Sequence, residues 1–310
     1  QKDRSHVEQD MEGAGWDEAS ADFMTDEETV FTGYDTLVDH SIVKSILCDN
    51  KPVSSVKEGD CCVVVLDRTP FYAESGGQAS DTGYIYNDNC KVEITDVKKI
   101  NKVFTHKATI LSGELRTGDN VEAMPLAVAR NRTSANHTAT HMLQKALQEV
   151  LGDHVKQSGS SVTKDGLRFD FNHFQAMTAD EIKRVEDTVN NKISHFIDVT
   201  TDVMSAEEAF ETGAMALFGE KYGDTVRVVS IGDYSKELCG GTHVRNSGQI
   251  GAFKILSESG VASGVRRIEA VTGLGILEKY NEDEAIINDT AAAVKSKRDM
   301  LAEKSAALMD

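Results

Sequence analysis

Residues 131–151 read NRTSANHTATHMLQKALQEVL, and the spacing of their apolar side chains decides the organisation of the chain. These side chains recur in alternating steps of three and one positions, which places them along one stripe of an α-helix. The stripe consists of Ala139, Met142, Leu143, Ala146, Leu147, Val150 and Leu151. We predict a helix over about 133–151, with Thr133 or Ser134 as its N-cap and Gly152 just past its end.

Two histidines, His137 and His141, lie four positions apart in this helix. At that spacing both side chains lie on one side of the helix and can share a metal ion. A turn of roughly 100° per residue puts them in a direction roughly 150° from the apolar stripe. They therefore face away from the core of this helix, toward solvent or a second layer of structure. A lone H-x-x-x-H pair is as readily an ordinary pair of histidines, so it does not establish a metal site by itself.

A second motif, Cys239-Gly-Gly-Thr-His243, supplies a thiol and an imidazole. Its two glycines permit the tight backbone that brings both side chains onto one ion. Alone, the motif would equally be a buried cysteine beside a loop histidine. Together the two motifs offer three nitrogens and one sulfur, which suit tetrahedral zinc, whereas magnesium and calcium prefer oxygen ligands. We predict one Zn²⁺ per chain, held by His137, His141, Cys239 and His243.

The role of this metal stays open at the level of sequence. A closed four-ligand site is usually structural. However, the ligands lie far apart in a domain that is large enough to fold without a metal staple. The helix also lacks the glutamate of the H-E-x-x-H metalloproteases, so any hydrolysis needs its water oriented by another residue.

Two further polar segments are candidates for ligand binding. The hydroxyl and amide groups of Gln157–Val162 (QSGSSV) could bind a small polar ligand, but we favour a surface turn. The segment Glu74–Gln78 (ESGGQ) superficially resembles a phosphate loop. It lacks the Lys-Ser/Thr ending and a following helix, so we predict no nucleotide binding there.

The remaining patterns predict an α+β fold. Many short runs rich in Val, Ile, Thr and aromatic residues, separated by turns, predict a small β-barrel over 32–124. Beyond Pro125, a capping box at Thr178–Glu181 opens a second helix. Strands are expected in an antiparallel sheet at 167–171, 226–232, 251–259 and 265–271. Residues 276–310 contain neither Gly nor Pro and predict a helix. The expected organisation is an acidic linker or extension (1–31), the barrel (32–124), a zinc-containing domain (125–275) and a helical linker (276–310).

Composition limits the classes of partner and compartment. The net charge of −18 disfavours nucleic acid, but ten acidic and two basic residues in 1–30 carry almost half of the imbalance. No run approaches eighteen apolar residues, so we expect no membrane partner, and the N-terminus lacks the apolar region of a secretory signal. Five cysteines without a framework spacing fit reduced thiols in a cytoplasmic protein.

Six segments, in the same order along about 30–275, resemble the editing region of alanyl-tRNA synthetases. They are PFYAESGGQASDTG (70–83), NRTSANHTATHMLQKAL (131–147), QSGSSV…LRFDF (157–171), GAMALFGEKYGD (213–224), ELCGGTHV (237–244) and SESG…GVRRIEAVTG (257–273). The free-standing alanyl-tRNA editing proteins share the two ligand motifs, and the threonyl-tRNA synthetase editing domain is a more distant relative. The detail of the resemblance favours a fragment of the synthetase that lacks the aminoacylation core.

The resemblance implies hydrolysis of the ester that joins serine or glycine to alanine tRNA. Such editing is needed because a small apolar pocket cannot strongly reject glycine or an added hydroxyl. It implies the same four zinc ligands and catalytic roles for Cys239, Gln157 and Thr140. It also implies that Gly240 and Gly241 form a backbone wall beside the metal, and Ser160 is a further expected substrate contact.

Basic residues flank these segments and are candidates for contacts with tRNA phosphates, although at least half should be ordinary surface residues. They are Lys156, Lys164, Arg168, Lys254, Arg266 and Arg267. The expected partner is alanine tRNA mischarged with serine or glycine, and self-association would involve regions beyond residue 310. Competing interpretations are a non-catalytic tRNA-binding module with a structural zinc, a free-standing editing protein, and an interaction fragment that associates through its terminal helix.

Overall fold

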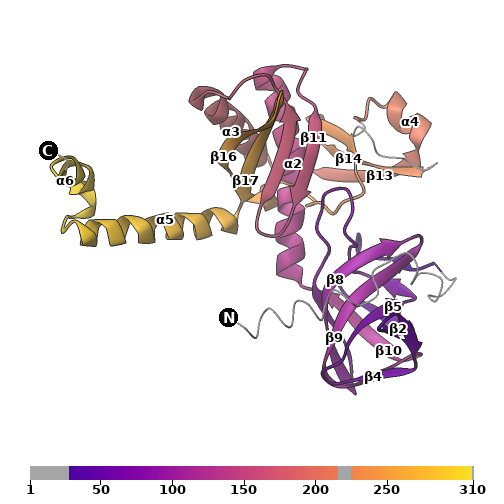
Figure 1. Ribbon diagram of the computed structural model, residues 1–310. Coiled ribbons are helices and arrows are strands. Elements are labelled where there is room, and N and C mark those ends of the chain that lie inside the picture. Colours follow the sequence, from indigo (N-terminus) through magenta and orange to yellow (C-terminus); the bar gives the residue numbers. More distant parts are fainter. Residues whose placement is uncertain (1–27, 216–224, 309–310) are drawn as a thin grey trace.

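The computed structural model describes residues 28–215 and 225–308, which form two lobes joined by the long helix α2 (Ala127–Leu151) (Figure 1). One lobe is a β-barrel, and the other combines helices with two antiparallel sheets. Helix α5 (Leu274–Ala293) projects away from both lobes. Most of the acidic segment 1–31 and residues 216–224 of the motif GAMALFGEKYGD lie outside the described residues.

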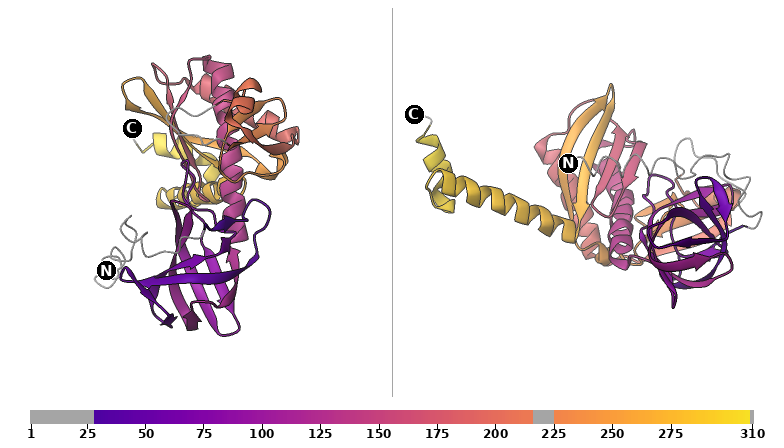
Figure 2. Two further views of the ribbon diagram at one scale, coloured as in Figure 1. Left: turned by 90° about the vertical axis from the view of Figure 1, so that its right-hand side faces the viewer. Right: turned by 60° about the horizontal axis from the view of Figure 1, so that its bottom comes forward.

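Six antiparallel strands close the barrel, which confirms the predicted fold of this region (Figure 2). Each strand pairs with the next in the order β10 (Asn120–Pro125), β7 (Gly83–Asn87), β8 (Cys90–Ile100), β9 (Val103–Arg116), β5 (Cys61–Leu66) and β2 (Asp39–Cys48). Strand β2 also pairs with β10, which closes the ring. Short strands lie at its margins, namely β1 (Val30–Phe31), β3 (Lys51–Val53), β4 (Ser55–Lys57) and β6 (Arg68–Thr69). Alternate side chains such as Val92 and Ile94 fill the interior, because successive residues of a strand point to opposite faces.

Helix α2 begins six residues earlier than the sequence analysis predicted. Its N-cap is Leu126, which makes no side-chain capping hydrogen bond. The expected caps have other partners: Thr133 Oγ1 donates to the carbonyl of Ala129, and Ser134 Oγ donates to Thr242 Oγ1. Buried contacts with the barrel lobe therefore extend the helix beyond the point that local capping signals indicated. The predicted end at Gly152 is confirmed.

The second lobe packs α2 and α3 (Ala179–Ser194) against a four-stranded antiparallel sheet. The order is β11 (Gln157–Val162), β12 (Leu167–Asn172), β17 (Val265–Thr272) and β16 (Phe253–Ala262). The capping box of Thr178 and Glu181 is present at the start of α3. The surface turn favoured for Gln157–Val162 is wrong, because all of these residues except Ser158 pair with β12 and form an edge strand, with a register shift between Gln157 and Gly159.

A smaller antiparallel sheet forms the other part of this lobe, and the second ligand motif directly follows its last strand. Its order is β13 (Val199–Ser205), β14 (Thr225–Ile231) and β15 (Ser235–Leu238), with the short helix α4 (Ala206–Glu211) between β13 and β14. The four strands predicted at 167–171, 226–232, 251–259 and 265–271 are therefore confirmed as antiparallel strands, but they do not share one sheet, because 226–232 belongs to β14 of this smaller sheet. The chain then passes through the 3₁₀ helix η2 (Ser247–Ile250) into β16.

The helix predicted over 276–310 is confirmed as α5, but α5 ends at Ala293 and does not continue to residue 310. Lys295 adopts a left-handed conformation (φ 50°), and the amides of Lys295 and Ser296 donate to the carbonyls of Ala292 and Ala291. This is the pattern of a Schellman C-cap, which ends a helix. The 3₁₀ helix η3 (Arg298–Met300) and helix α6 (Leu301–Ala306) follow. Within the described ranges, the helices are all too short or too polar to cross a membrane.

A buried ion pair between Arg130 of α2 and Asp81 of the barrel lobe connects the two. The Arg130 guanidinium contacts the Asp81 carboxylate and donates to the carbonyls of Gly33 and Pro70, at 2.7 and 2.8 Å. Both charged side chains are almost fully buried, at 4% and 6% exposure. The loop that carries Asp81 also pairs with β11, through a bridge between Gln78 and Val162. The barrel loop is thereby held against the second lobe on two sides.

We expect Arg130→Met to lower the free energy of unfolding by about 3–5 kcal/mol, because the Asp81 carboxylate stays buried without its partner. Arg132→Met is the matched control, since its partner Glu278 is exposed and such surface pairs contribute about 0–1 kcal/mol. Urea denaturation of both variants measures the difference. Equal, small losses would show that the buried pair does not fasten the lobes.

Candidate metal centre

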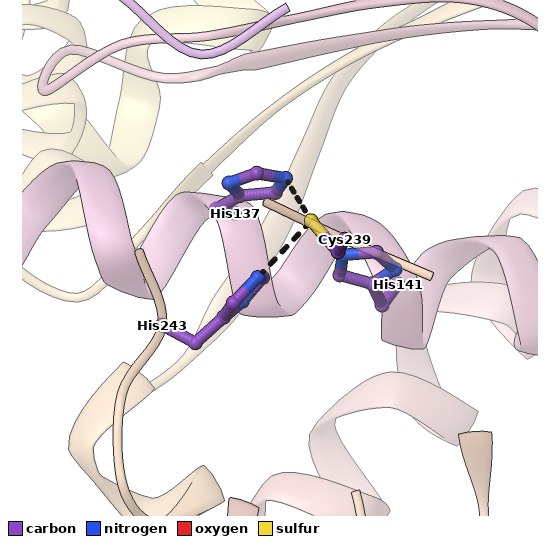
Figure 3. A group of neighbouring side chains, drawn as sticks. All are labelled: His137, His141, Cys239 and His243. Carbon is purple, nitrogen blue, oxygen red and sulfur yellow. Dashed lines mark hydrogen bonds between the residues drawn. The ribbon is translucent and has the colours of Figure 1, made fainter. Parts of the chain in front are cut away.

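The two ligand motifs meet in the interior of the second lobe (Figure 3). Helix α2 presents His137 and His141 on the face opposite its apolar stripe, and each is 6% exposed. The loop after β15 covers this face and brings Cys239 and His243 to it. The helix geometry left open whether the two histidines face solvent or a second layer of structure. In the structure they face a second layer.

The four donor atoms are close enough together to hold one metal ion, and two of their separations match tetrahedral zinc. One donor atom from each residue lies within 4.8 Å of the other three. Cys239 Sγ is 3.5 Å from His137 Nε2 and 3.3 Å from His243 Nε2. Zinc bonds of about 2.0–2.3 Å would separate tetrahedral nitrogen and sulfur ligands by about 3.3–3.6 Å.

Each histidine ring is held at its Nδ1 atom, which turns Nε2 toward the cluster. His137 Nδ1 lies 2.7 Å from Gln78 Oε1, His141 Nδ1 lies 2.6 Å from Glu237 Oε2, and His243 Nδ1 lies 3.2 Å from Thr138 Oγ1. Metal-binding histidines typically donate their other ring N–H in this way. The Nε2 of His141 is buried without a hydrogen-bond partner among the described residues, which is costly unless a ligand occupies it. The donor set and this atom both fit a bound zinc ion.

The charges around the Cys239 thiol favour its thiolate form, which is the form that binds metals. Burial alone would raise the pKa of the Cys239 thiol, but His137, His243 and His141 together hold that pKa well below its usual range. Burial lowers the pKa of His243 to about 3 and keeps it neutral. Burial also opposes charging of His141, yet the charges of Glu237 and Cys239 raise its pKa well above the usual value. A metal ion must displace this proton when it binds.

A cavity of about 100 Å³ opens beside the cluster. Five residues that the sequence analysis assigned to the pocket line it: Thr140, Gln157, Ser160, Gly240 and Gly241. They come from α2, from β11 and from the ligand loop, so three separate segments converge here. His137, His141 and Cys239 complete the wall next to the metal position.

The two glycines of the ligand loop are under different constraints. A Cβ atom on Gly241 would lie 2.1 Å from the ring of His137, so only glycine allows this approach. A Cβ on Gly240 would contact nothing within 4 Å. The carbonyl of Gly240 accepts from the Tyr34 hydroxyl at 2.5 Å, and that of Gly241 accepts from Arg227 at 2.9 Å. The backbone of these two glycines is thus hydrogen-bonded by Tyr34 and Arg227, which the sequence analysis did not single out.

The sequence analysis also missed the residues that hydrogen-bond to the histidine rings, and it missed part of the cavity lining. Gln78, Thr138 and Glu237 were not assigned a role, and Tyr72 and Ser75 line the cavity. The segment Glu74–Gln78, dismissed as a phosphate loop, is the one that reaches the site. Its Gly-Gly pair signalled a tight turn but gave no indication of what the turn would contact.

The six basic residues proposed for tRNA contact lie outside this cavity, and four of them form ion pairs. Arg266 pairs with Glu258, Arg267 with Asp170, Lys164 with Asp165 and Lys254 with Glu186. Lys156 is exposed, and Arg168 is partly buried. A separate groove of about 580 Å³ adjoins the other side of the ligand loop, with Arg227 and Arg245 in its wall. A role for any of these cations in binding tRNA stays a prediction.

We expect protein purified without added zinc to hold close to one ion per chain, and Cys239→Ala to lose most of it. The fold should survive, because the apolar core of the second lobe does not include the thiol. Cys61→Ala is the matched control, since Cys61 is an exposed free cysteine of the barrel. Metal analysis and circular dichroism measure the two outcomes. Full zinc content in Cys239→Ala would contradict the proposed ligand set.

Comparison with known proteins identifies the family. Residues 1–125 match the family described as tRNA synthetases class II (A), and residues 226–269 match the threonyl and alanyl tRNA synthetase second additional domain. The second match includes Cys239 and His243.

Three of the curated relatives that the chain matches share the name alanine–tRNA ligase. That of Clostridioides difficile is 45% identical over 313 residues, which cover 100% of this chain and 36% of the relative. That of Thermoanaerobacter pseudethanolicus is 46% identical over 296 residues, which cover 96% of this chain and 34% of the relative. That of Pseudoalteromonas translucida is 47% identical over 286 residues, which cover 92% of this chain and 33% of the relative. The chain thus spans about a third of the length of these relatives. Matched along its length at this identity, the chain belongs to the alanyl-tRNA synthetase family.

Proposed function

We propose that this chain hydrolyses the ester bond of seryl-tRNA and glycyl-tRNA when either amino acid has been attached to alanine tRNA. The observation that carries the proposal is the small polar cavity that shares a wall with the His137, His141 and Cys239 side chains. A cavity of about 100 Å³ suits a small amino acid and excludes large ones. The relatives named alanine–tRNA ligase support the choice of tRNA.

The side chains of the cavity offer complementary hydrogen-bonding groups. Thr140 Oγ1 donates to the carbonyl of Asn136 at 2.9 Å, so its lone pairs are available to accept from a substrate hydroxyl or amino group. Gln157 Nε2 donates to Ser160 Oγ at 3.2 Å. This leaves Gln157 Oε1 as an acceptor and the Ser160 hydroxyl as a donor. A serine side chain can therefore be bound from both directions.

Water must be oriented without a carboxylate. Among the described residues that line the cavity, none is Asp or Glu, and the nearby Glu237 carboxylate is engaged by His141. We propose that Gln157 Oε1, whose amide lines the cavity, accepts from a water molecule and holds it against the ester. Bound zinc would supply positive charge, either to stabilise the developing negative charge or to anchor the amino acid. Thr140 would then position the amino acid against the wall formed by Gly240 and Gly241.

We expect few basic side chains of this chain to contact the tRNA phosphates. The ion pairs of Arg266 and Arg267 reduce the charge that they present to phosphate, whereas Lys156 is exposed. We propose alanine tRNA as the partner and the cytoplasm as the compartment, which the five free cysteines fit. Self-association would involve regions outside residues 1–310.

Selectivity among charged tRNAs tests the proposal. We expect hydrolysis of seryl- and glycyl-tRNA and little hydrolysis of alanyl-tRNA, since alanine leaves the buried polar partners of a serine hydroxyl unpaired. Glycine lacks that hydroxyl, so its distinction from alanine rests on one methyl group, worth about 1–3 kcal/mol. Discrimination of glycine from alanine should therefore be weaker than discrimination of serine from alanine. Rates on the three charged tRNAs measure both.

Gln157→Ala separates the two roles of this amide. The rate on seryl-tRNA should fall more than the rate on glycyl-tRNA if the amide contacts the hydroxyl, and both should fall equally if it positions water. Ser158→Ala, on the same strand, is the matched control, because Ser158 is exposed and hydrogen-bonds to Asn172. Equal rates on alanyl- and seryl-tRNA would leave a general esterase. Full zinc content without hydrolysis of any substrate would favour a structural zinc in a tRNA-binding module.

A further inference from the structure

We infer that Gln78, carried by a loop of the barrel lobe, is a positioning residue of the metal centre that fixes the ring orientation and tautomer of His137. The inference rests on the proposed zinc site and goes beyond it, because it makes metal affinity depend on a residue that does not contact the metal position. It also assigns a role to the segment Glu74–Gln78, which sequence patterns alone left without one.

The Gln78 amide connects the two ligand motifs. Its Oε1 lies 2.7 Å from His137 Nδ1 and 2.9 Å from the backbone nitrogen of Thr242, and its Nε2 donates to Thr242 Oγ1 at 3.0 Å. The residue is 0% exposed. One buried amide therefore contacts a ligand of α2 and the ligand loop between Cys239 and His243.

These contacts determine both the amide orientation and the histidine tautomer. The backbone N–H of Thr242 can only donate, so the Gln78 atom that faces it must be the oxygen. The same oxygen faces His137 Nδ1, and an amide oxygen can only accept. His137 must therefore carry its proton on Nδ1, which leaves the Nε2 lone pair directed at Cys239 Sγ and the metal position.

The loop has little freedom to move this amide. The residues on either side of Gln78 are both hydrogen-bonded to Val162 of β11, through the Gly77 carbonyl at 2.8 Å and the Ala79 amide at 2.9 Å. Gly77 has φ +81°, and a Cβ there would lie 2.6 Å from the carbonyl oxygen of Ser160. The turn is thus pressed against the same strand that lines the cavity, and only glycine allows the approach.

The histidine ring is equally confined on its other side. A Cβ on Gly241 would meet the His137 ring at 2.1 Å and Gln78 Oε1 at 2.9 Å, so this glycine packs directly over the hydrogen bond. With Gln78 in place, the ring has one orientation and one tautomer. Without the acceptor, the ring loses the partner that selects this tautomer, and metal binding must restrict it at a cost in affinity.

Three variants test this role. Gln78→Met keeps the length of the side chain but removes the acceptor, and we expect zinc affinity to fall by about 10–100-fold. Gln78→Glu restores an acceptor for both N–H groups, and Thr242 can donate its own hydroxyl to the carboxylate, so affinity should stay within a few-fold of wild type. Ser134→Ala removes the other hydroxyl that holds Thr242 Oγ1 and leaves the Gln78–His137 contact intact. It should also stay within a few-fold.

The readouts are zinc affinity by competition with a chelator and the visible spectrum of the Co²⁺-loaded protein, which reports the geometry around the metal. Gln78→Met should change the Co²⁺ spectrum, while Gln78→Glu and Ser134→Ala should preserve it. Wild-type affinity in Gln78→Met would overturn the inference and leave the proposed function standing. Equal losses in Gln78→Met and Gln78→Glu would also overturn it, because a buried-packing role would then suffice. A wild-type chain that binds no zinc would overturn both proposals.

Discussion

Helix α2 is buried on all sides through its middle, and many of its buried side chains are polar. Burying a polar group without a hydrogen bond is costly, so each of these side chains restricts what can pack beside it. Thr138 and Thr140 donate to carbonyls one turn earlier in the helix, and Asn136 reaches the carbonyl of Thr163 and the hydroxyl of Thr272. The histidines find partners in the barrel loop and on β15. The arrangement of both lobes around α2 supplies hydrogen-bond partners to most of these polar side chains, and the Nε2 of His141 is left directed at the cluster.

The sequence was most informative where a local period or spacing determines geometry. Histidines four apart on a helix and a Cys-x-x-x-His loop place the four donor atoms in one cluster, as the spacing predicted. Short strands with close turns predicted the barrel, and the capping box predicted the start of α3. The residues of the cavity, such as Gln157 and Ser160, were expected from resemblance to a family, because their own pattern favoured a turn.

What the sequence could not predict depends on contacts between distant segments. The first six residues of α2 are helical because Arg130 is fixed by Asp81 of the barrel loop, not because of a capping signal. The edge strand β11 forms because β12 offers it a partner. Gln78 lies 59 positions before His137, and no local pattern connects the two. The end of α5 at Ala293 was missed because the left-handed residue after its C-cap is Lys295, where glycine is the usual signal.

The order of the ligands along the chain has a consequence for biosynthesis. Gln78 is made first, the two histidines of α2 follow, and His243 emerges 102 residues after His141. At about 5–20 residues per second, the ribosome needs roughly 5–20 s to cover that interval. During most of this interval, the nascent chain offers a barrel and two imidazoles of the cluster, because Cys239 and His243 come at its end. A metal site made of all four residues can therefore form only after the barrel has been synthesised, and the last motif to leave the ribosome completes it.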